Sequence, residues 1–246
     1  MDDKKLVKTL FMVMTHGNEQ VGLSLWNDNP QGYNQYCQWQ TIIANPRAMG
    51  LGKRYIESDL NRSFNIPNPR TYEEKRARAL TPIISSYDVV YDIHQTFVGD
   101  KMQDCIFVNE KTDQIKRAVS PLSARYVIVD NNKDFNGHFA TSVAKVGITI
   151  EYSRKGSYGM DKKIFLNDFG RIIINKNLGI KRIWMSTYTA VPKNKQPQGI
   201  NLKNFKLITE REKRLLNLPL EGKFYPVFVD GYPDYYCFIN RKIKSS

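Results

Sequence analysis

Short apolar runs rich in β-branched residues alternate with helix-like segments along most of the chain, and this alternation constrains the fold more than any other feature. The runs that read as buried strands lie at residues 8–14, 39–45, 87–93, 105–109, 126–130 and 147–152. Short apolar runs bounded by polar or turn residues are typical of central strands. Strands that alternate with helices predict an α/β fold with a mixed or largely parallel central sheet.

Helix-like patterns fill the intervals between these strands. They lie at residues 21–26, 70–86, 112–122, 138–146 and 161–179. Within the second pattern we expect Pro82 to kink or interrupt the helix, because proline lacks the N–H that a helix interior needs. The last pattern has apolar residues at helical spacing, with Asp161 as its predicted N-cap and Gly179 as its predicted C-cap.

The chain changes character near Met185. Beyond it, several Pro, Asn and Gly breaks precede two strand-like runs at residues 225–231 and 235–243. We therefore predict a main α/β domain over residues 1–184 and a small β-rich C-terminal region over residues 185–246.

The charge of the chain is strongly positive, with 37 Lys and Arg against 24 Asp and Glu and a net charge of +13. Clustered cations would favour nucleic-acid binding. Here the basic residues form short groups spread over the whole length, and no nucleic-acid recognition motif accompanies them. We expect no nucleic-acid partner, and the excess charge suits an anionic small substrate.

Neither a membrane segment nor a thiol chemistry is indicated. No run approaches the roughly 20 apolar residues of a membrane span, and residues 1–17 lack the pattern of a signal peptide. Cys37, Cys105 and Cys237 stand far apart without a CxxC motif, so they are expected to be small buried residues. We expect a cytoplasmic protein that binds no membrane.

Histidine is scarce, and two of the three histidines follow predicted strands. His16 and His94 stand at the carboxyl ends of two strands, where ligand sites of α/β sheets gather. Glu19 lies three residues after His16, and two histidines with one glutamate are a ligand set of catalytic zinc sites. An isolated HxxE pair arises often by chance, but the second strand-end histidine favours a metal site. Asp92 could orient the His94 imidazole, whereas His138 is expected to be structural.

Four motifs resemble, in order, those of the aspartoacylase and succinylglutamate desuccinylase family, a branch of the zinc carboxypeptidase superfamily. They are HGNE at 16–19, RYIESDLNRSF at 54–64, DIH at 92–94 and IE at 150–151. The similarity runs through most of residues 8–152, and YPVFV at 225–229 resembles the closing segment of the family. The resemblance implies a zinc-carboxypeptidase-like fold and one zinc ion as cofactor.

The same resemblance implies roles for individual residues. His16, Glu19 and His94 match the zinc ligands of the family. Glu151 matches the catalytic carboxylate that takes a proton from the attacking water and passes it to the leaving amine. Arg54 matches the arginine that polarises the scissile carbonyl and stabilises the oxyanion.

Substrate-binding residues are implied in the same way. Asn61 and Arg62 match the pair that holds a substrate carboxylate, a task that suits a planar guanidinium. Tyr235 matches a C-terminal tyrosine that helps to bind substrate, with the register among the three tyrosines of GYPDYYCF left open. The alternatives are an ordinary polar turn at residues 59–62 and a surface ion pair between Glu151 and a following basic residue.

Two departures from the family pattern bear on specificity. The chain reads YSRKG after Glu151, where the family commonly has a Gly-Pro pair. Relatives that cleave N-acetylaspartate carry an arginine about ten residues before that glutamate, and without gaps Thr141 occupies the position here. A preference for aspartate is therefore not expected.

Together these features predict a zinc-dependent amidohydrolase that removes the acyl group from an N-acyl amino acid such as N-acetylaspartate or N-succinylglutamate. The partner would be a small anionic N-acyl amino acid, and a homodimer is compatible with the sequence. One alternative is a metallocarboxypeptidase that acts on peptides or peptidoglycan fragments. Another is a basic binding protein with a degenerate metal site.

Overall fold

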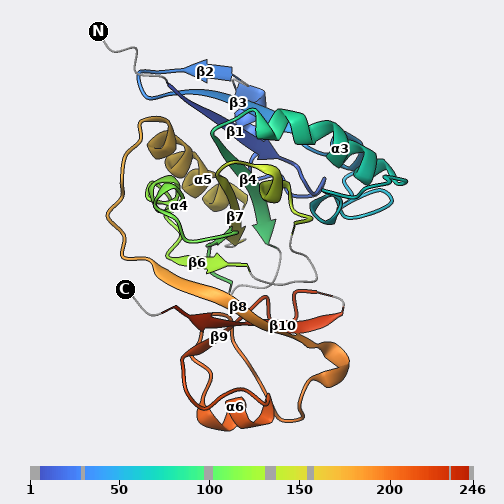
Figure 1. Cartoon of the computed structure of the whole chain (residues 1–246), viewed down its shortest axis with the longest axis vertical. Helices are drawn as coiled ribbons and strands as arrows, with labels where there is room; N and C mark the ends of the chain where they lie inside the picture. The colour runs from blue at the N-terminus through green and yellow to red at the C-terminus, as the bar shows by residue number, and fades with distance from the viewer. Residues whose placement is uncertain are drawn as a thin grey trace.

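One ten-stranded sheet runs through the whole molecule in the order β2-β3-β1-β4-β7-β5-β6-β8-β10-β9 (Figure 1). The computed structural model describes residues 6–28, 31–96, 102–130, 137–153, 158–232 and 234–243. The strands are β1 (Val7–Val13), β2 (Gln31–Tyr33), β3 (Cys37–Ile43), β4 (Val89–Thr96), β5 (Cys105–Val108), β6 (Tyr126–Val129), β7 (Gly147–Ser153), β8 (Ile183–Pro192), β9 (Phe224–Val227) and β10 (Tyr235–Lys242).

The sheet is mixed, as the sequence predicted. Strands β3, β1, β4 and β7 run parallel to one another, and so do β5, β6 and β8. The two parallel groups meet at the antiparallel pair of β5 and β7, and β2, β9 and β10 add antiparallel pairs at the two ends. The carboxyl ends of β1 and β4 therefore lie side by side, which brings the polar residues that follow them together.

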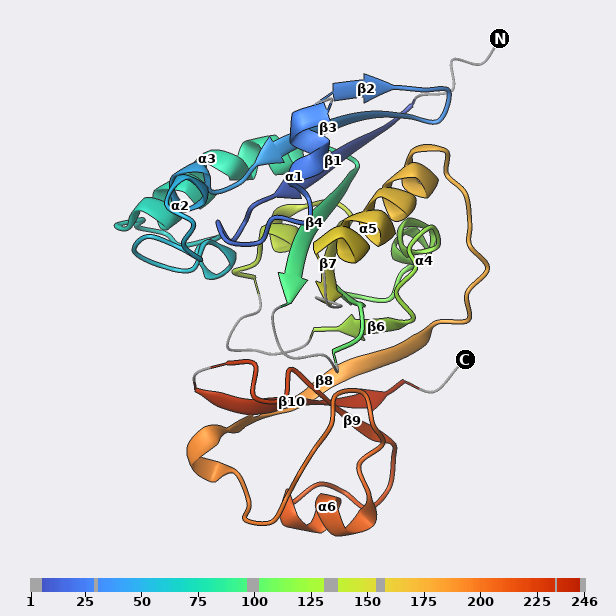
Figure 2. The same ribbon diagram turned by 180° about the vertical axis from the view of Figure 1, so that it is seen from behind.

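Helices cover both faces of the sheet (Figure 2). They are α1 (Leu23–Asp28), α2 (Pro46–Gly50), α3 (Tyr72–Ser85), α4 (Asp113–Val119), α5 (Tyr158–Ile173) and α6 (Glu210–Leu215), with short 3₁₀ helices η1 (Leu60–Arg62), η2 (Ala140–Val143) and η3 (Lys193–Lys195). Side chains of β1 alternate between the faces: Phe11 joins a core with α4 and α5, whereas Leu10 and Met12 join a core with α3. Because β1 is buried on both faces, its sequence is a continuous apolar run.

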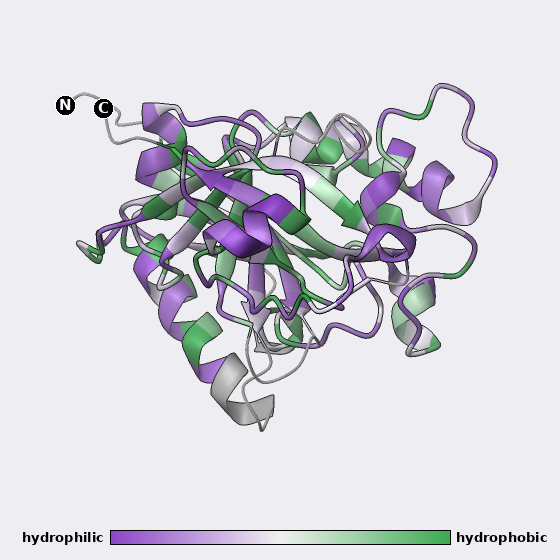
Figure 3. Ribbon diagram, turned by 90° about the horizontal axis from the view of Figure 1, so that it is seen from below, coloured by the Kyte–Doolittle hydropathy of each residue, from purple (hydrophilic) through white to green (hydrophobic). Residues whose placement is uncertain are grey.

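The helices carry hydrophilic and hydrophobic residues side by side (Figure 3), as expected of helices that bury one stripe. Among the described residues, none of the helices has the length and apolar character that crossing a membrane requires. Cys37, Cys105 and Cys237 are buried free thiols, as predicted.

Two helix predictions were wrong in their interiors. Helix α3 is not interrupted but continues through Pro82 to Ser85. Pro82 is exposed, so the carbonyl that loses its N–H partner can be hydrated on the solvent side. Residues 138–146 form only the short η2, because the chain there runs as a tight connection beside β7, where Thr141 packs against Gly147.

The predicted caps of the last long helix were also wrong. Helix α5 begins at Tyr158, so Asp161 lies inside it. It ends at Ile173, well before Gly179. Asn175 adopts the left-handed conformation with φ of 51°, and the N–H of Lys176 bonds to the carbonyl of Arg171 at 2.8 Å. Asn175 thus takes the place that glycine usually occupies in this helix ending.

The C-terminal part continues the sheet. Strand β8 pairs with β6 in parallel and with β10 in antiparallel orientation, so the predicted boundary between residues 184 and 185 falls within β8. Val227 and Phe228 share a core cluster with Cys105 and Ile128 of the preceding part. The division into two domains stays a prediction.

Candidate metal centre and active-site cavity

The loop after β1 turns sharply to present His16. Met14 has φ of 58°, a left-handed conformation that costs a non-glycine residue about 1–2 kcal/mol. Its carbonyl accepts a hydrogen bond from the N–H of Asn45 at 3.1 Å, which holds the turn. Gly17 follows with no room for a side chain, since a Cβ would lie 2.2 Å from the carbonyl carbon of Ala48. The sequence HGNE therefore has its glycine where the backbone approaches α2 most closely.

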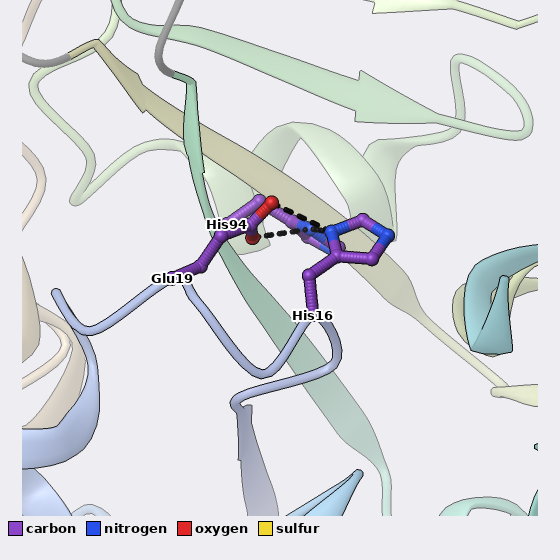
Figure 4. A group of neighbouring side chains, drawn as sticks. All are labelled: His16, Glu19 and His94. Atoms are coloured by element: carbon purple, nitrogen blue, oxygen red, sulfur yellow. Dashed lines mark hydrogen bonds and ion pairs between the residues drawn. The ribbon is translucent and has the colours of Figure 1, made fainter. Parts of the chain in front are cut away.

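His16, Glu19 and His94 form a buried cluster at the carboxyl ends of β1 and β4, with the Glu19 carboxylate between the two imidazoles (Figure 4). Nδ1 of His16 lies 2.6 Å from Oε1 of Glu19, and Nδ1 of His94 lies 3.0 Å from Oε2. The two Nδ1 atoms are 3.2 Å apart. All three residues offer ligand atoms within 4.8 Å of one another, which is a suitable arrangement for one metal ion.

The outer nitrogen of each imidazole is held by a carboxylate. Nε2 of His16 lies 3.0 Å from Asp59, and Nε2 of His94 lies 2.8 Å from Asp92. Thr15 donates to the second oxygen of Asp92 at 2.6 Å. Such carboxylates place the proton on the outer nitrogen and leave Nδ1 free to bind a metal. The orienting role predicted for Asp92 is confirmed, whereas the contact of Asp59 with His16 was missed.

The electrostatics of the cluster favour charge separation in the metal-free protein. Burial lowers the pKa of His94, but Asp92 and Glu19 outweigh it and raise that pKa well above its ordinary value. The pKa of His16 is also raised, mainly by Glu19 against burial. Burial opposes ionisation of Glu19, yet the two imidazoles hold its pKa well below the usual range. Two imidazole nitrogens and an ionised carboxylate fit the donor set that zinc prefers.

Arg54 lies beside this cluster. Its guanidinium donates to Glu19 at 3.5 Å and to Asp59 at 3.1 Å. About 40% of its side chain is exposed, on the side of the cavity. A cation fixed by two carboxylates next to a metal site can stabilise negative charge on a bound substrate.

Glu151 lies opposite His94 in the register of β4 and β7. One of its carboxylate oxygens accepts a hydrogen bond from the Thr96 hydroxyl at 2.6 Å. Burial raises the pKa of Glu151, although the charge of His94 opposes that shift. A carboxylate close to a metal site, with a raised pKa, suits proton transfer. The alternative ion-pair partners Arg154 and Lys155 lie outside the described residues.

A cavity of about 680 Å³ opens onto these groups. Its catalytic wall is formed by His16, Glu19, Arg54, Asn61, Arg62 and Glu151. The rest of the lining includes uncharged polar residues and an aromatic group, namely Asn109, Thr141, Thr149, Thr187, Asn240, Phe107, Phe139, Phe228, Tyr232 and Phe238. The structure thus brings six of the sequence-predicted site residues to one cavity, with His94 buried beside it.

Asn61 and Arg62 lie in η1, whose N-cap is Asp59. The side-chain oxygen of Asn61 accepts the N–H of Ala140 at 3.1 Å. The Arg62 guanidinium lies 4.8 Å from the centre of the Phe139 ring and donates to the Asn61 carbonyl at 2.7 Å. The segment is a polar turn and also a wall of the cavity, so the two readings of it are compatible.

The tyrosine in the cavity is Tyr232 rather than Tyr235. Tyr235 packs its ring 5.3 Å from that of Phe238 and does not line the cavity. Burial and the charge of Glu151 raise the pKa of Tyr232 to about 12, against the opposing charges of Arg62 and Arg54. The motif GYPDYYCF contains three tyrosines, and only the turn after β9 determines which one faces the arginines.

His138 lies outside the metal cluster. Its Nδ1 bonds to the carbonyl of Phe64 at 2.8 Å, and its own carbonyl accepts the Phe64 N–H at 3.2 Å. His138 therefore has the structural role expected of it. Thr141 lines the cavity with its hydroxyl 3.3 Å from that of Thr149.

Comparison with known proteins identifies the family. The sequence profile of the succinylglutamate desuccinylase/aspartoacylase catalytic domain matches residues 6–167. The chain belongs to this family. Its resemblance to the family, read from four motifs, is thereby confirmed.

Relatives in the desuccinylase and aspartoacylase family cover different shares of the chain. A probable aspartoacylase of Trichodesmium erythraeum is 29% identical over 167 residues, covering 60% of this chain and 56% of the relative. The chain thus spans little more than half the length of that curated relative. Murine aminoacylase 3 has a TM-score of 0.73 at 17% identity, covering 98% of this chain and 95–96% of its two solved structures' chains. The succinylglutamate desuccinylase of Chromobacterium violaceum also has a TM-score of 0.73, at 15% identity, covering 98% and 86%. These structures share the fold.

Proposed function

We propose that this protein is a zinc-dependent amidohydrolase that removes the acyl group from an N-acyl amino acid with a free carboxylate, in the cytoplasm. The observation that carries the proposal is that the His16, Glu19 and His94 cluster, Glu151 and two arginines converge on one cavity. Membership of the desuccinylase and aspartoacylase family supports the same reaction class.

The metal would be held by Nδ1 of His16, Nδ1 of His94 and the Glu19 carboxylate. A bound zinc ion supplies Lewis-acid activation of water and of the substrate carbonyl. Asp59 and Asp92 keep the two imidazoles in the tautomer that binds a metal, since each accepts from an outer nitrogen.

The remaining steps belong to side chains of this chain. Glu151 takes a proton from the attacking water on one of its carboxylate oxygens, and the Thr96 hydroxyl holds the other. Glu151 then passes the proton to the amine nitrogen as the amide C–N bond breaks. The Arg54 guanidinium stabilises the oxyanion that develops on the carbonyl.

Arg62 provides the anchor for the substrate carboxylate. Its guanidinium is packed on the Phe139 ring at the cavity wall, where a planar fork can bind a carboxylate through two hydrogen bonds. Near Thr141 and Thr149 the lining is uncharged, and Phe107 lies opposite Thr149 in the register of β5 and β7. These contacts suit a neutral amino-acid side chain better than the second carboxylate of an aspartate.

The direct test is hydrolysis by the zinc-loaded protein of acetyl, formyl and succinyl derivatives of aspartate, glutamate, leucine and phenylalanine, alongside short peptides. We expect release of free amino acid, fastest from neutral side chains. The Glu151→Gln variant should retain one zinc ion per chain and lose about 10²- to 10⁴-fold in kcat. The exposed Glu110 provides a matched control, and Glu110→Gln should leave kcat unchanged.

The panel also separates the alternatives. Hydrolysis of peptides alone would identify a metallocarboxypeptidase. A protein without stoichiometric zinc, whose activity is the same with and without Glu151, would be a binding protein with a degenerate metal site.

A further inference from the structure

Glu73 carries a fully buried carboxylate outside the cavity, near the start of α3. Its Oε1 accepts a hydrogen bond from the N–H of Ile56 at 2.7 Å and one from the side-chain amide of Asn45 at 3.3 Å. Its Oε2 accepts from the N–H groups of Glu57 and Ser58, both at 3.1 Å. Among the described residues, no Lys or Arg forms an ion pair with it. The charge is therefore stabilised by four N–H donors, three of them successive backbone groups.

The segment that receives these bonds carries the arginines of the site. Residues 51–59 connect α2 to η1 without a helix or strand of their own, so their N–H groups have no regular partner. Arg54 precedes the three bonded amides, and Asn61 and Arg62 follow them. The segment lies beside α2 and α3 in Figure 2. Glu73 thus holds, from the side of α3, the loop whose side chains reach the cavity.

The same loop is tied to the metal cluster on its other side. The carbonyl of Arg54 accepts the N–H of Gly17 at 3.1 Å. Asn45, which donates to Glu73, also accepts the N–H of Ala48 at 3.3 Å and donates its own N–H to Met14. Glu73 therefore connects the arginine loop, the start of α2 and the turn that presents His16.

An ionised carboxylate suits this position in a way that its amide would not. Burial raises the pKa of Glu73, but the backbone N–H bonds outweigh it and hold the pKa below that of an ordinary glutamate. Both oxygens of the carboxylate accept, whereas a glutamine has one accepting oxygen and one donating nitrogen. A glutamine here would point an N–H group at one of the backbone N–H groups.

We propose that Glu73 is a positioning residue, which fixes residues 56–58 so that Arg54 and Arg62 are aimed into the cavity. It touches no substrate. Its effect on catalysis rests on the proposed function, whereas its effect on the loop does not.

The test compares Glu73→Gln with Glu74→Gln, a matched change at the next residue. The Glu74 carboxylate accepts the N–H groups of Arg70 and Thr71, which caps α3. We expect Glu73→Gln to lower kcat/KM by about tenfold to a hundredfold, through both a higher KM and a lower kcat. Its zinc content should equal that of the wild type, because the metal ligands come from β4 and the loop after β1. Glu74→Gln should leave both constants within twofold of the wild type.

Hydrogen exchange gives a readout that does not depend on activity. In Glu73→Gln the amides of residues 56–58 should exchange about tenfold faster, as expected for the loss of a buried hydrogen bond, while β1 and β4 stay protected. Glu73→Asp keeps the charge on a shorter side chain and should restore part of the protection and of kcat/KM. It also serves if Glu73→Gln does not fold.

The outcomes separate the two proposals. Unchanged exchange at residues 56–58 in Glu73→Gln, or kinetic constants within twofold of the wild type, would overturn the positioning role. If the wild type hydrolyses no N-acyl amino acid, the proposed function fails, and the exchange experiment alone decides whether Glu73 holds the loop.

Discussion

At the residue scale, the metal cluster is a set of opposite charges that a cation would have to enter. The pKa values of His16 and His94 are raised in the metal-free protein, whereas that of Glu19 is lowered. Imidazoles with raised pKa values keep their protons to higher pH, and a metal binds only the deprotonated ring. Metal and protons therefore compete for the same nitrogen atoms.

We predict that zinc uptake at pH 7 releases protons, up to two per ion from His16 and His94. Since the folded pKa values are raised, release should be largest at or below neutral pH and should vanish as pH rises above them, so zinc affinity increases with pH. Titration calorimetry in buffers of different ionisation enthalpy measures the number. Asp92→Asn removes the charge that raises the pKa of His94 most, and should reduce the release. Heat that is independent of the buffer would contradict this prediction.

The sequence predicted the metal cluster because its ligands follow two strands that a parallel sheet brings side by side. It did not predict the contact of Asp59 with His16, because Asp59 reaches the cluster through an irregular loop whose path no periodic pattern describes. The tyrosine was misplaced for a similar reason. Tyr232 lies in a turn next to Asp230, which has φ of 56°, so the direction of its side chain depends on the turn rather than on strand alternation.

At the scale of elements, the strands were predicted well and their connections poorly. Continuous apolar runs such as β1 identify strands buried on both faces. Residues 138–146 have an apolar pattern but follow a tight path beside Gly147, and only η2 forms. The short edge strand β2 and the single-turn helices have too few residues to show a period. Helix α6 was missed, although Thr209 and Glu212 form a capping box that the sequence displays.

The turn between β1 and α1 depends on the close approach of Gly17 to α2. We predict that Gly17→Ala destabilises the protein by about 1–3 kcal/mol, because the added methyl group would overlap the backbone of Ala48 and Met49. The displaced loop should also weaken zinc binding, since His16 and Glu19 flank Gly17. Thermal unfolding and zinc titration measure the two effects.

Gly170→Ala is the matched control, because a Cβ at Gly170 in α5 meets no atom within 4 Å. That change should raise stability by about 0.5–1 kcal/mol, as alanine favours a helix over glycine. Equal stability and zinc affinity in Gly17→Ala and the wild type would show that the loop can move at little cost.

At the scale of the whole molecule, the cavity belongs to both parts of the chain. Residues 227–232 line it opposite Arg54 and Glu151. The rings of Phe228 and Phe107 stack 5.7 Å apart, which joins the turn after β9 to β5. The predicted division at residue 184 therefore separates residues that share a cavity wall and a hydrophobic core.

We predict that residues 1–184 alone do not form a cooperatively folded protein. Without residues 185–246, β6 loses its pairing with β8, and side chains such as Ile128 lose their cover. Each large apolar side chain that is uncovered costs about 1.5–3 kcal/mol, and the whole stability of a domain is about 5–15 kcal/mol. The fragment should bind a hydrophobic dye and lack a sharp thermal transition. Adding residues 185–246 as a separate chain should restore the transition and stoichiometric zinc binding. A sharp transition and bound zinc in residues 1–184 alone would show that the two parts fold independently.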